Sequence, residues 1–179
     1  MKKIYFIFFT IFAFSFISCS KEDAQDPLPI IVNADFVRLD ITNKRLEFQN
    51  LSTTSFGGSL TTPNSNIVKY DLYVRRQKTN GVTVSNYIKM LTVIDFPYDL
   101  KVTPQLIAEA YGIPLTDIQS GESYSFLGFA TTKQGKIISY NDLSSIVKTQ
   151  PGLKQGFKFN TDIQTKAVFD PNFNNYLTQ

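Results

Sequence analysis

Alternation of apolar and polar residues is the main pattern beyond the N-terminal segment. Successive side chains of a β-strand point to opposite faces, so strict alternation over a short run indicates a half-buried strand. Three such runs cover residues 37–41, 46–49 and 68–75. Turn-forming residues lie between them, at 53–58 and 63–66. Several short strands separated by turns predict an all-β fold, an antiparallel β-sandwich.

The strongest local signal is a β-hairpin whose turn contains Asn80 and Gly81. This pair suits either a two-residue type I′ turn or a three-residue loop, Thr79–Gly81, with Gly81 left-handed. The three-residue loop keeps apolar residues on one face, since it places Leu72 opposite Ile88. A slip of one residue would invert every side chain, so we predict the three-residue loop. Its register gives these outer pairs: Asp71 with Lys89, Tyr73 with Tyr87, and Arg75 with Ser85.

One short helix is expected among the strands, just after residue 103. Thr103 is a suitable N-cap, Pro104 suits the first helical position and Gly112 suits the C-terminal stop. An apolar face that can lie on the edge of the sandwich is formed by Leu106, Ile107 and Ala110.

The first eighteen residues have the pattern of an export signal. Lys2 and Lys3 precede residues 4–17, a run of 14 residues without a charge. A membrane-spanning helix needs about 20 apolar residues, so this run is too short to be one. A charged start followed by a short apolar core is typical of a secretory signal peptide. We therefore predict a signal peptide over 1–18, directly before Cys19.

The segment Phe16-Ile17-Ser18-Cys19 resembles the lipobox of bacterial lipoproteins, with Phe16 in place of the usual aliphatic residue. The resemblance implies cleavage before Cys19, a diacylglyceryl group on its thiol and a further acyl chain, such as palmitate, on its amine. Two or more acyl chains anchor a protein stably in a bilayer. Residues 20–29 are mostly polar and contain two prolines, which predicts a stiff, solvated tether over 19–33. Its acidic residues look like the export signal of surface lipoproteins in the Bacteroidota, which implies an outer-membrane location facing the cell exterior.

Residues 118–136 are similar to the penultimate hairpin of fibronectin type III-like domains. Gly121 and Tyr124 match the glycine-to-tyrosine spacing of that family, and the resemblance implies that the Tyr124 hydroxyl bonds back to the chain as a tyrosine corner. Phe126 and Ala130 match inward positions, whereas Gly128 stands where valine is usual. The expected fold is therefore a fibronectin type III or immunoglobulin-like antiparallel β-sandwich with one short inserted helix.

The helix and the Leu-Thr-Asp-Ile segment after it look like an insertion seen in accessory lipoproteins of starch-utilisation-type glycan importers. This resemblance implies an accessory role beside such an importer. We place the immunoglobulin-like body at 34–145. Residues 146–179 form a C-terminal extension that either adds edge strands or stays partly unstructured.

Composition narrows the candidate chemistry. The chain has no His, no Trp and a single Cys, which excludes histidine-based catalytic triads, His-ligated zinc and disulfide frameworks. Without Lys2 and Lys3 the charges nearly balance, at 16 basic and 15 acidic residues, and this does not favour a nucleic-acid partner. No cofactor motif is present, and residues 170–174 begin like a calcium loop but lack its glycine and final acid, so no metal is expected.

No strong catalytic motif appears, and we predict that the chain is not an enzyme. A small glycoside hydrolase remains an alternative, with Asp95 and Asp99 as its acid–base pair. The same two residues are equally explained as polar positions around the turn Phe96-Pro97-Tyr98.

The aromatic residues on the outer face of the hairpin are the remaining candidates for a ligand-binding site. Sugar rings present apolar C–H faces that pack on aromatic planes, while polar neighbours bond the hydroxyl groups. Tyr73 and Tyr87, flanked by Arg75 and Lys89, are the candidate ligand-binding residues; the same tyrosines are also explained as cross-strand packing. The expected function is glycan binding or an accessory role in a glycan uptake complex at the outer membrane. The alternative is a structural or adhesive module that docks a partner protein by strand addition.

Overall fold

The computed structural model describes residues 35–84 and 86–165. The predicted signal peptide, Cys19 and the whole predicted tether therefore lie outside the described residues, as does the end of the C-terminal extension. Within the described residues, no helix is long and apolar enough to cross a membrane.

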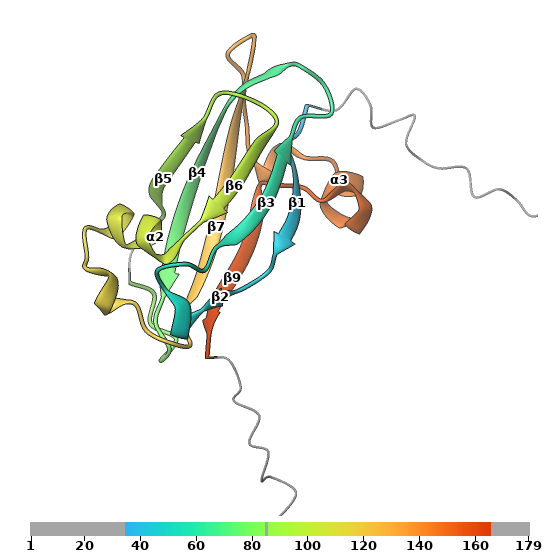
Figure 1. Ribbon diagram of the computed structural model, residues 1–179. Helices are drawn as coiled ribbons and strands as arrows, with labels where there is room; N and C mark the ends of the chain where they lie inside the picture. The colour runs from blue at the N-terminus through green and yellow to red at the C-terminus, as the bar shows by residue number, and fades with distance from the viewer. Residues whose placement is uncertain (1–34, 85, 166–179) are drawn as a thin grey trace, which may run out of the picture. The chain divides into compact units, whose positions relative to one another are not determined.

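The smaller of two β-sheets has the strand order β1–β3–β6, and both of its pairings are antiparallel. It lies in front of the larger sheet in the view of Figure 1. Its strands are β1 (Arg38–Asn43), β3 (Phe56–Thr61) and β6 (Tyr98–Val102).

The larger sheet has the order β2–β9–β7–β4–β5, and the short strand β8 also pairs with β7. All its pairings are antiparallel except that of β2 with β9, which is parallel. Its strands are β2 (Leu46–Glu47), β4 (Ile67–Gln77), β5 (Ile88–Val93), β7 (Ser123–Thr132), β8 (Ile137–Ile138) and β9 (Lys158–Gln164). The prediction of a mainly β fold with antiparallel sheets is confirmed.

Aromatic side chains join the two sheets. Phe56 of β3 stacks on Phe126 of β7 at 5.9 Å between ring centroids, and Phe126 stacks on Phe159 of β9 at 5.0 Å. All three rings are buried. Offset-stacked aromatic pairs add roughly 0.5–1.5 kcal/mol each beyond the area that they bury, so this cluster fixes the sheets face to face.

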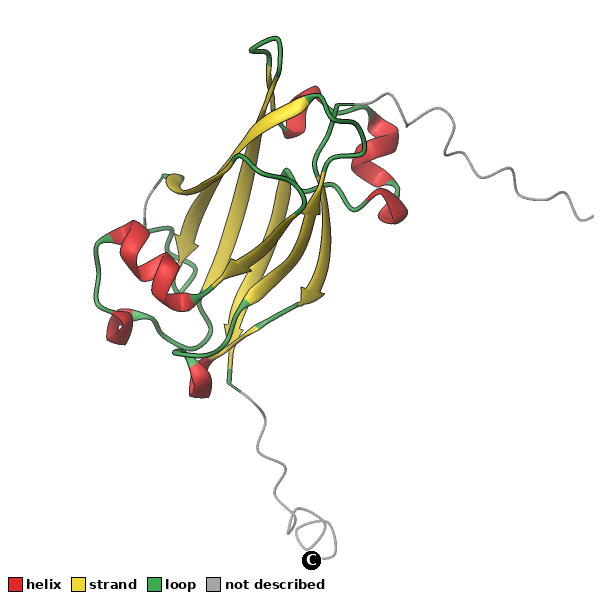
Figure 2. Ribbon diagram, turned by 45° about the horizontal axis from the view of Figure 1, so that its top comes forward, coloured by secondary structure: helices red, strands yellow, loops and turns green. Residues whose placement is uncertain are grey.

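Helices lie at the periphery of the strands (Figure 2). The predicted inserted helix is α2 (Pro104–Tyr111): Thr103 accepts a hydrogen bond from the Leu106 amide at 3.1 Å, and Gly112 is left-handed with φ 62°. Its buried face differs from the expected one, because Pro104, Ile107 and Ala108 are buried while Leu106 and Ala110 are only half-buried. A second helix, α3 (Ser145–Thr149), was not predicted.

Two of the predicted alternating runs differ from the structure. One strand ends earlier than predicted, and the other has its buried and exposed residues exchanged at its start. The run at 46–49 ends as a strand at Glu47, since Phe48–Asn50 forms a 3-10 helix and Phe48 is exposed. In β4 the register to β7 shifts between Ile67 and Lys69. Val68 is therefore exposed, while Ile67 takes the buried position instead.

The predicted hairpin is right at its tip and wrong along its strands. Lys78 and Val82 close the three-residue loop through an amide–carbonyl bond of 2.9 Å, and Gly81 is left-handed with φ 80°. Beyond the tip, extra residues enter the second strand, so Leu72 lies opposite Leu91 rather than Ile88. A bulge beside Leu72 and Tyr73 is part of this shift, and it turns Val93 into the core.

The first part of the C-terminal extension belongs to the same body as the rest. Strand β9 lies between β2 and β7, inside the sheet rather than at its edge. Phe157, Phe159 and Ile163 are buried. The boundary proposed at residue 145 therefore does not separate two structural units within the described residues.

Candidate functional site

The outer face of the larger sheet carries a cluster of partly exposed rings. Phe129 of β7 contacts Tyr73 of β4 edge-on, with 5.3 Å between ring centroids. Both rings line a hollow of about 440 Å³, which we call the aromatic hollow. Its lining residues are Lys69, Asp71, Tyr73, Tyr87, Leu127, Phe129, Thr131 and Ile137. These side chains come from strands β4, β7 and β8 and from the residue before β5, and alternation along β4 and β7 turns them away from the core.

A second hollow, of about 380 Å³, continues from the first along β7 and is called here the tyrosine hollow. It shares Tyr87, Leu127 and Phe129 with the aromatic hollow. Its polar lining comes from Arg75, Ser125, Ser139, Asn141, Lys158 and Asn160, and Tyr140 adds another ring. The two hollows together form a groove in which apolar ring surfaces alternate with hydrogen-bonding groups.

Cations lie against two of these rings. The Arg75 guanidinium carbon is 5.0 Å from the centre of the Tyr87 ring. The ammonium nitrogens of Lys148 and Lys158 are 5.3 and 5.4 Å from the centre of the Tyr140 ring. Such cation–π contacts hold both partners in place and are worth roughly 0.5–1 kcal/mol at exposed sites.

Asp71 is the only carboxylate among the residues that line these two hollows, and its charge is balanced. Lys89 and Lys69 approach it at 2.8 and 3.0 Å, and the Thr92 hydroxyl donates to it at 2.6 Å. Burial disfavours ionisation of this carboxyl, but the hydrogen bonds from Lys89, Thr92 and Lys69 outweigh it and lower its pKa to about 2. The same contact raises the pKa of Lys89.

The structure brings three of the four predicted ligand-binding residues into one groove. Tyr73 and Tyr87 line the aromatic hollow, and Arg75 lines the tyrosine hollow. The predicted Tyr73–Tyr87 strand pair is wrong, because the shifted register places Lys89 opposite Tyr73. The predicted strand pair of Asp71 with Lys89 is also wrong, because Thr92 lies opposite Asp71, but Lys89 still reaches Asp71 from the diagonal position through an ion pair. Whether these residues bind a ligand stays a prediction.

Sequence reasoning missed Phe129, Tyr140 and Lys158 as members of this groove. Phe129 carried a usable signal: Phe126 and Ala130 were expected to face inward, so Phe129 had to face outward. Tyr140 and Lys158 carried no such signal, since they reach the groove from the short segment after β8 and from β9.

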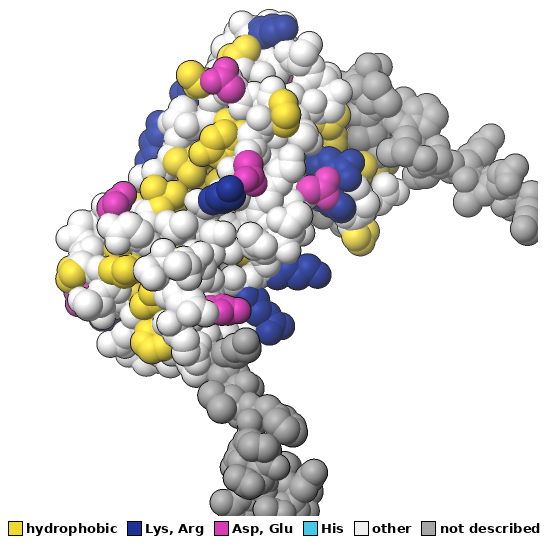
Figure 3. Space-filling view, in the orientation of Figure 1, with side chains coloured by type: hydrophobic (Ala, Val, Ile, Leu, Met, Phe, Trp, Pro, Cys, Tyr) yellow, Lys and Arg dark blue, Asp and Glu magenta, His cyan; other side chains and the backbone are white. Residues whose placement is uncertain are grey.

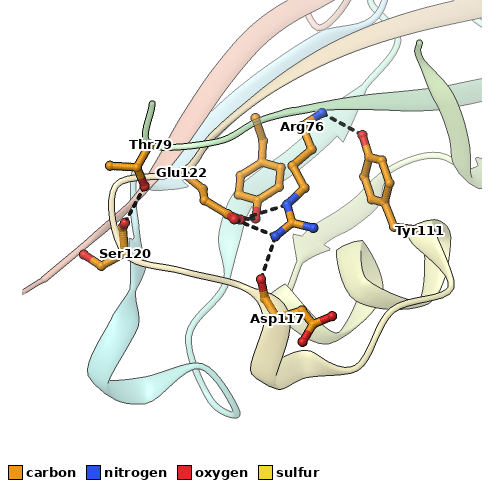
Figure 4. A network of polar contacts seen from close by, with 7 residues as sticks. Arg76, Thr79, Tyr111, Asp117, Ser120 and Glu122 are labelled. Atoms are coloured by element: carbon orange, nitrogen blue, oxygen red, sulfur yellow. Dashed lines mark hydrogen bonds and ion pairs between the residues drawn. The ribbon is translucent and has the colours of Figure 1, made fainter. Parts of the chain in front are cut away.

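A polar network is buried on the inward side of β4, near its C-terminal end (Figure 4). The Arg76 guanidinium bonds both carboxylate oxygens of Glu122, at 2.5 and 3.0 Å, and the Asp117 carbonyl at 2.6 Å. Burial opposes the charge on Arg76, but the bonds and charge of Glu122 outweigh it and raise the Arg76 pKa. Solvent reaches only 5% and 1% of the Arg76 and Glu122 side chains, so this network stabilises the fold and is not accessible to a ligand.

Tyr124 belongs to this network and corrects an expectation. Its hydroxyl donates to the Glu122 carboxylate at 2.6 Å instead of bonding back to the main chain. Burial raises the pKa of Tyr124, and the bond to Glu122 adds to the effect. The buried arginine explains the change, because Glu122 is drawn inward to balance it and becomes the acceptor beside the Tyr124 hydroxyl.

The opposite face of the molecule looks different. Hydrophobic side chains run in a diagonal band over the region of β5 and β6 in Figure 3, which views the smaller sheet. Asp99 of the alternative acid–base pair lies in β6, where it is exposed and paired with Lys101 at 2.8 Å. Asp95 is exposed in the loop before β6.

Among residues 35–84 and 86–165, no group of three or more acidic or Cys side chains is placed to hold a metal ion.

No protein-family model matches this chain, and neither does any curated protein compared with it.

Proposed function

We propose that this chain is a lipid-anchored, non-catalytic module that binds glycan, or serves a glycan uptake complex, at the outer membrane. The observation that carries the proposal is the groove on the outer face of the larger sheet. It combines partly exposed rings from Tyr73, Tyr87 and Phe129 with hydrogen-bonding side chains on a β-sheet scaffold. The apolar face of a sugar ring packs on such rings, and its hydroxyl groups bond the polar neighbours.

The cell-surface location rests on the N-terminal sequence. The charged start, the 14-residue apolar run and Cys19 at its end favour export followed by lipidation. The anchor brings the lipid bilayer in as a partner, through acylated Cys19. An outer-membrane transporter complex is the second proposed partner, and it follows from the resemblance to accessory lipoproteins of glycan importers.

The finer fold assignment is part of the same proposal. A fibronectin type III or immunoglobulin-like sandwich is supported by the two strand orders, β1–β3–β6 and β9–β7–β4–β5. The aromatic cluster that joins the two sheets also supports it. The Tyr124 bond to Glu122 departs from the expected tyrosine corner.

Affinity electrophoresis of the full chain through gels that contain different polysaccharides tests the binding function. We expect at least one polymer to retard the chain. Tyr87→Ala and Phe129→Ala should each weaken that binding about tenfold, as expected for the loss of one ring contact. Tyr98→Ala is the matched control, because Tyr98 is 39% exposed on the opposite sheet. Unretarded migration in every gel, or equal loss in the Tyr98 variant, would contradict the proposal.

A further inference from the structure

A third hollow lies next to the tyrosine hollow, at the side of the molecule where β1, β9 and α3 meet. It has a volume of about 630 Å³, and we call it the lysine hollow. It shares Lys158 and Phe159 with the tyrosine hollow, which in turn shares Tyr87 and Phe129 with the aromatic hollow. All three volumes lie in the range of roughly 300–1,000 Å³ that is typical of small-molecule sites. Three neighbouring hollows with common lining residues suit an extended polymer better than a single small ligand.

The charge along this path is one-sided. Arg75 and Lys158 line the tyrosine hollow, and Lys44, Lys148, Lys154 and Lys158 line the lysine hollow. Among residues 35–84 and 86–165, no carboxylate lines either hollow. Lys154 is paired with Asp40, but Arg75, Lys148 and Lys158 have no carboxylate partner within the described part of the chain. Asp71 in the aromatic hollow is already balanced by Lys69 and Lys89.

The unbalanced cations are also held in position. Arg75 is fixed against the Tyr87 ring, and Lys148 and Lys158 both lie against the Tyr140 ring. Lys148 donates a further bond to the Asn141 carbonyl at 3.1 Å. Two ammonium groups near one ring carry the same charge, so an anion bound beside the Tyr140 ring would be attracted to both.

We propose that the ligand of this groove is an acidic polysaccharide, whose carboxylate or sulfate groups meet Arg75, Lys158 and Lys148 while its sugar rings pack on Tyr87 and Phe129. The inference rests on the proposed glycan-binding function and adds the charge of the ligand to it. The alternation of ring and cation along the groove matches a polymer in which charged groups recur along a chain of sugar rings.

A matched pair of polymers tests the charge directly. The full chain, purified in detergent, is titrated calorimetrically with polygalacturonate and with its fully methyl-esterified form, which has the same backbone without the charge. Dextran sulfate and dextran form a second pair. We expect an acidic polymer to bind at least about tenfold more tightly than its neutral partner. Added salt should weaken the binding of the acidic polymer, because salt screens ionic contacts.

Single-charge variants localise the effect. Lys158→Gln and Arg75→Gln should each weaken the acidic polymer about fivefold, the loss expected for one exposed ionic contact. Lys101→Gln removes the same charge from the opposite sheet and should change nothing. Circular dichroism confirms that each variant is folded.

The outcomes separate the two proposals. If neutral polymers bind as tightly as acidic ones and Tyr87→Ala weakens them, the acidic preference is wrong and the glycan-binding function stands. If none of the four polymers binds, the acidic polysaccharide is wrong, and the glycan-binding function is then decided by the affinity electrophoresis described above. If single-stranded oligothymidylate binds more tightly than every polysaccharide and responds to the same variants, the groove binds nucleic acid and the acidic polysaccharide is excluded.

Discussion

Arg76 and Glu122 form the most deeply buried ion pair of the described residues, and each depends on the other. Arg76 stands at an inward position of β4, in phase with the buried residues Tyr70, Leu72 and Val74. A charge at such a position must be paired, because an isolated buried charge is very costly. Arg76 therefore requires an acidic partner, and nothing near it in the sequence shows which acid that is. Glu122 is distant in sequence and arrives only when β7 pairs with β4.

Glu122→Gln is expected to destabilise the fold by about 3–5 kcal/mol, since it leaves a buried guanidinium without a counter-charge. Urea unfolding followed by circular dichroism measures the free energy of unfolding. Asp99→Asn, which breaks an exposed pair with Lys101, is the control and should leave the midpoint unchanged. Equal effects of the two substitutions would show that the Arg76–Glu122 pair has no special role.

Asp71 makes stability depend on pH in the acidic range. Its pKa in the folded protein is about 2, below the ordinary value of 3.8, so the unfolded chain takes up a proton at higher pH than the folded one. The stability that Asp71 contributes is therefore complete above about pH 4 and is lost as the pH falls toward 2. Asp71→Asn should lower the free energy of unfolding by about 1–2 kcal/mol at neutral pH and by much less near pH 2. A difference that stays constant with pH would contradict this account.

At the scale of elements, the packing of β4 against β7 requires a glycine at position 128. A Cβ atom at Gly128 would collide with the ring of Tyr70, which is fully buried on the neighbouring strand. The Tyr70 hydroxyl donates to the Gly156 carbonyl, which holds the ring in that place. Gly128 stands where the resembled family has valine, and the tyrosine ring fills the space that a valine side chain would take.

Gly128→Ala should cost about 1–3 kcal/mol of stability, because the buried ring cannot move away freely. In the double variant Gly128→Ala/Tyr70→Leu the two losses should be less than additive, since the smaller side chain removes the collision. Gly152→Ala is the control, because a Cβ atom there meets nothing within 4 Å. Strict additivity of the two changes, measured by thermal or urea unfolding, would show that the ring and the glycine do not compete for the same space.

Local chemistry decides which elements the sequence predicts well. The caps of α2 and the left-handed Gly81 depend on residues adjacent in sequence, and both are found as predicted. The register of β5 depends instead on burying Val93 and on two irregularities in the hairpin. Alternation alone cannot reveal a bulge, because an extra residue changes the phase without changing the composition.

The candidate site also contains residues that local sequence patterns predict and residues that only tertiary packing brings in. Tyr73, Arg75 and Tyr87 are predicted because they alternate along a recognisable hairpin, and the structure places them in the groove. Tyr140 and Lys158 reach it through tertiary packing of the segments that follow β7. No period in the sequence connects those segments to β4.

At the scale of the whole molecule, the proposed function requires two parts, a membrane anchor and a binding surface. The anchor is a proposal from the sequence, and it has a direct consequence for the full chain. After detergent phase separation of the producing cells, the chain should enter the detergent phase, and Cys19→Ser should move it to the aqueous phase, since the acyl chains are lost. An aqueous wild-type chain with an unmodified thiol would contradict the anchor.

The binding face is tested most directly by mapping backbone amide shifts in nuclear magnetic resonance spectra while oligogalacturonate or dextran oligosaccharides are added. We predict that the largest shifts fall on the outer face of the larger sheet, at Tyr87, Leu127 and Phe129, and leave β6 unchanged. Shifts centred on β6, or no shifts with either sugar, would contradict the central claim that this groove is the binding surface.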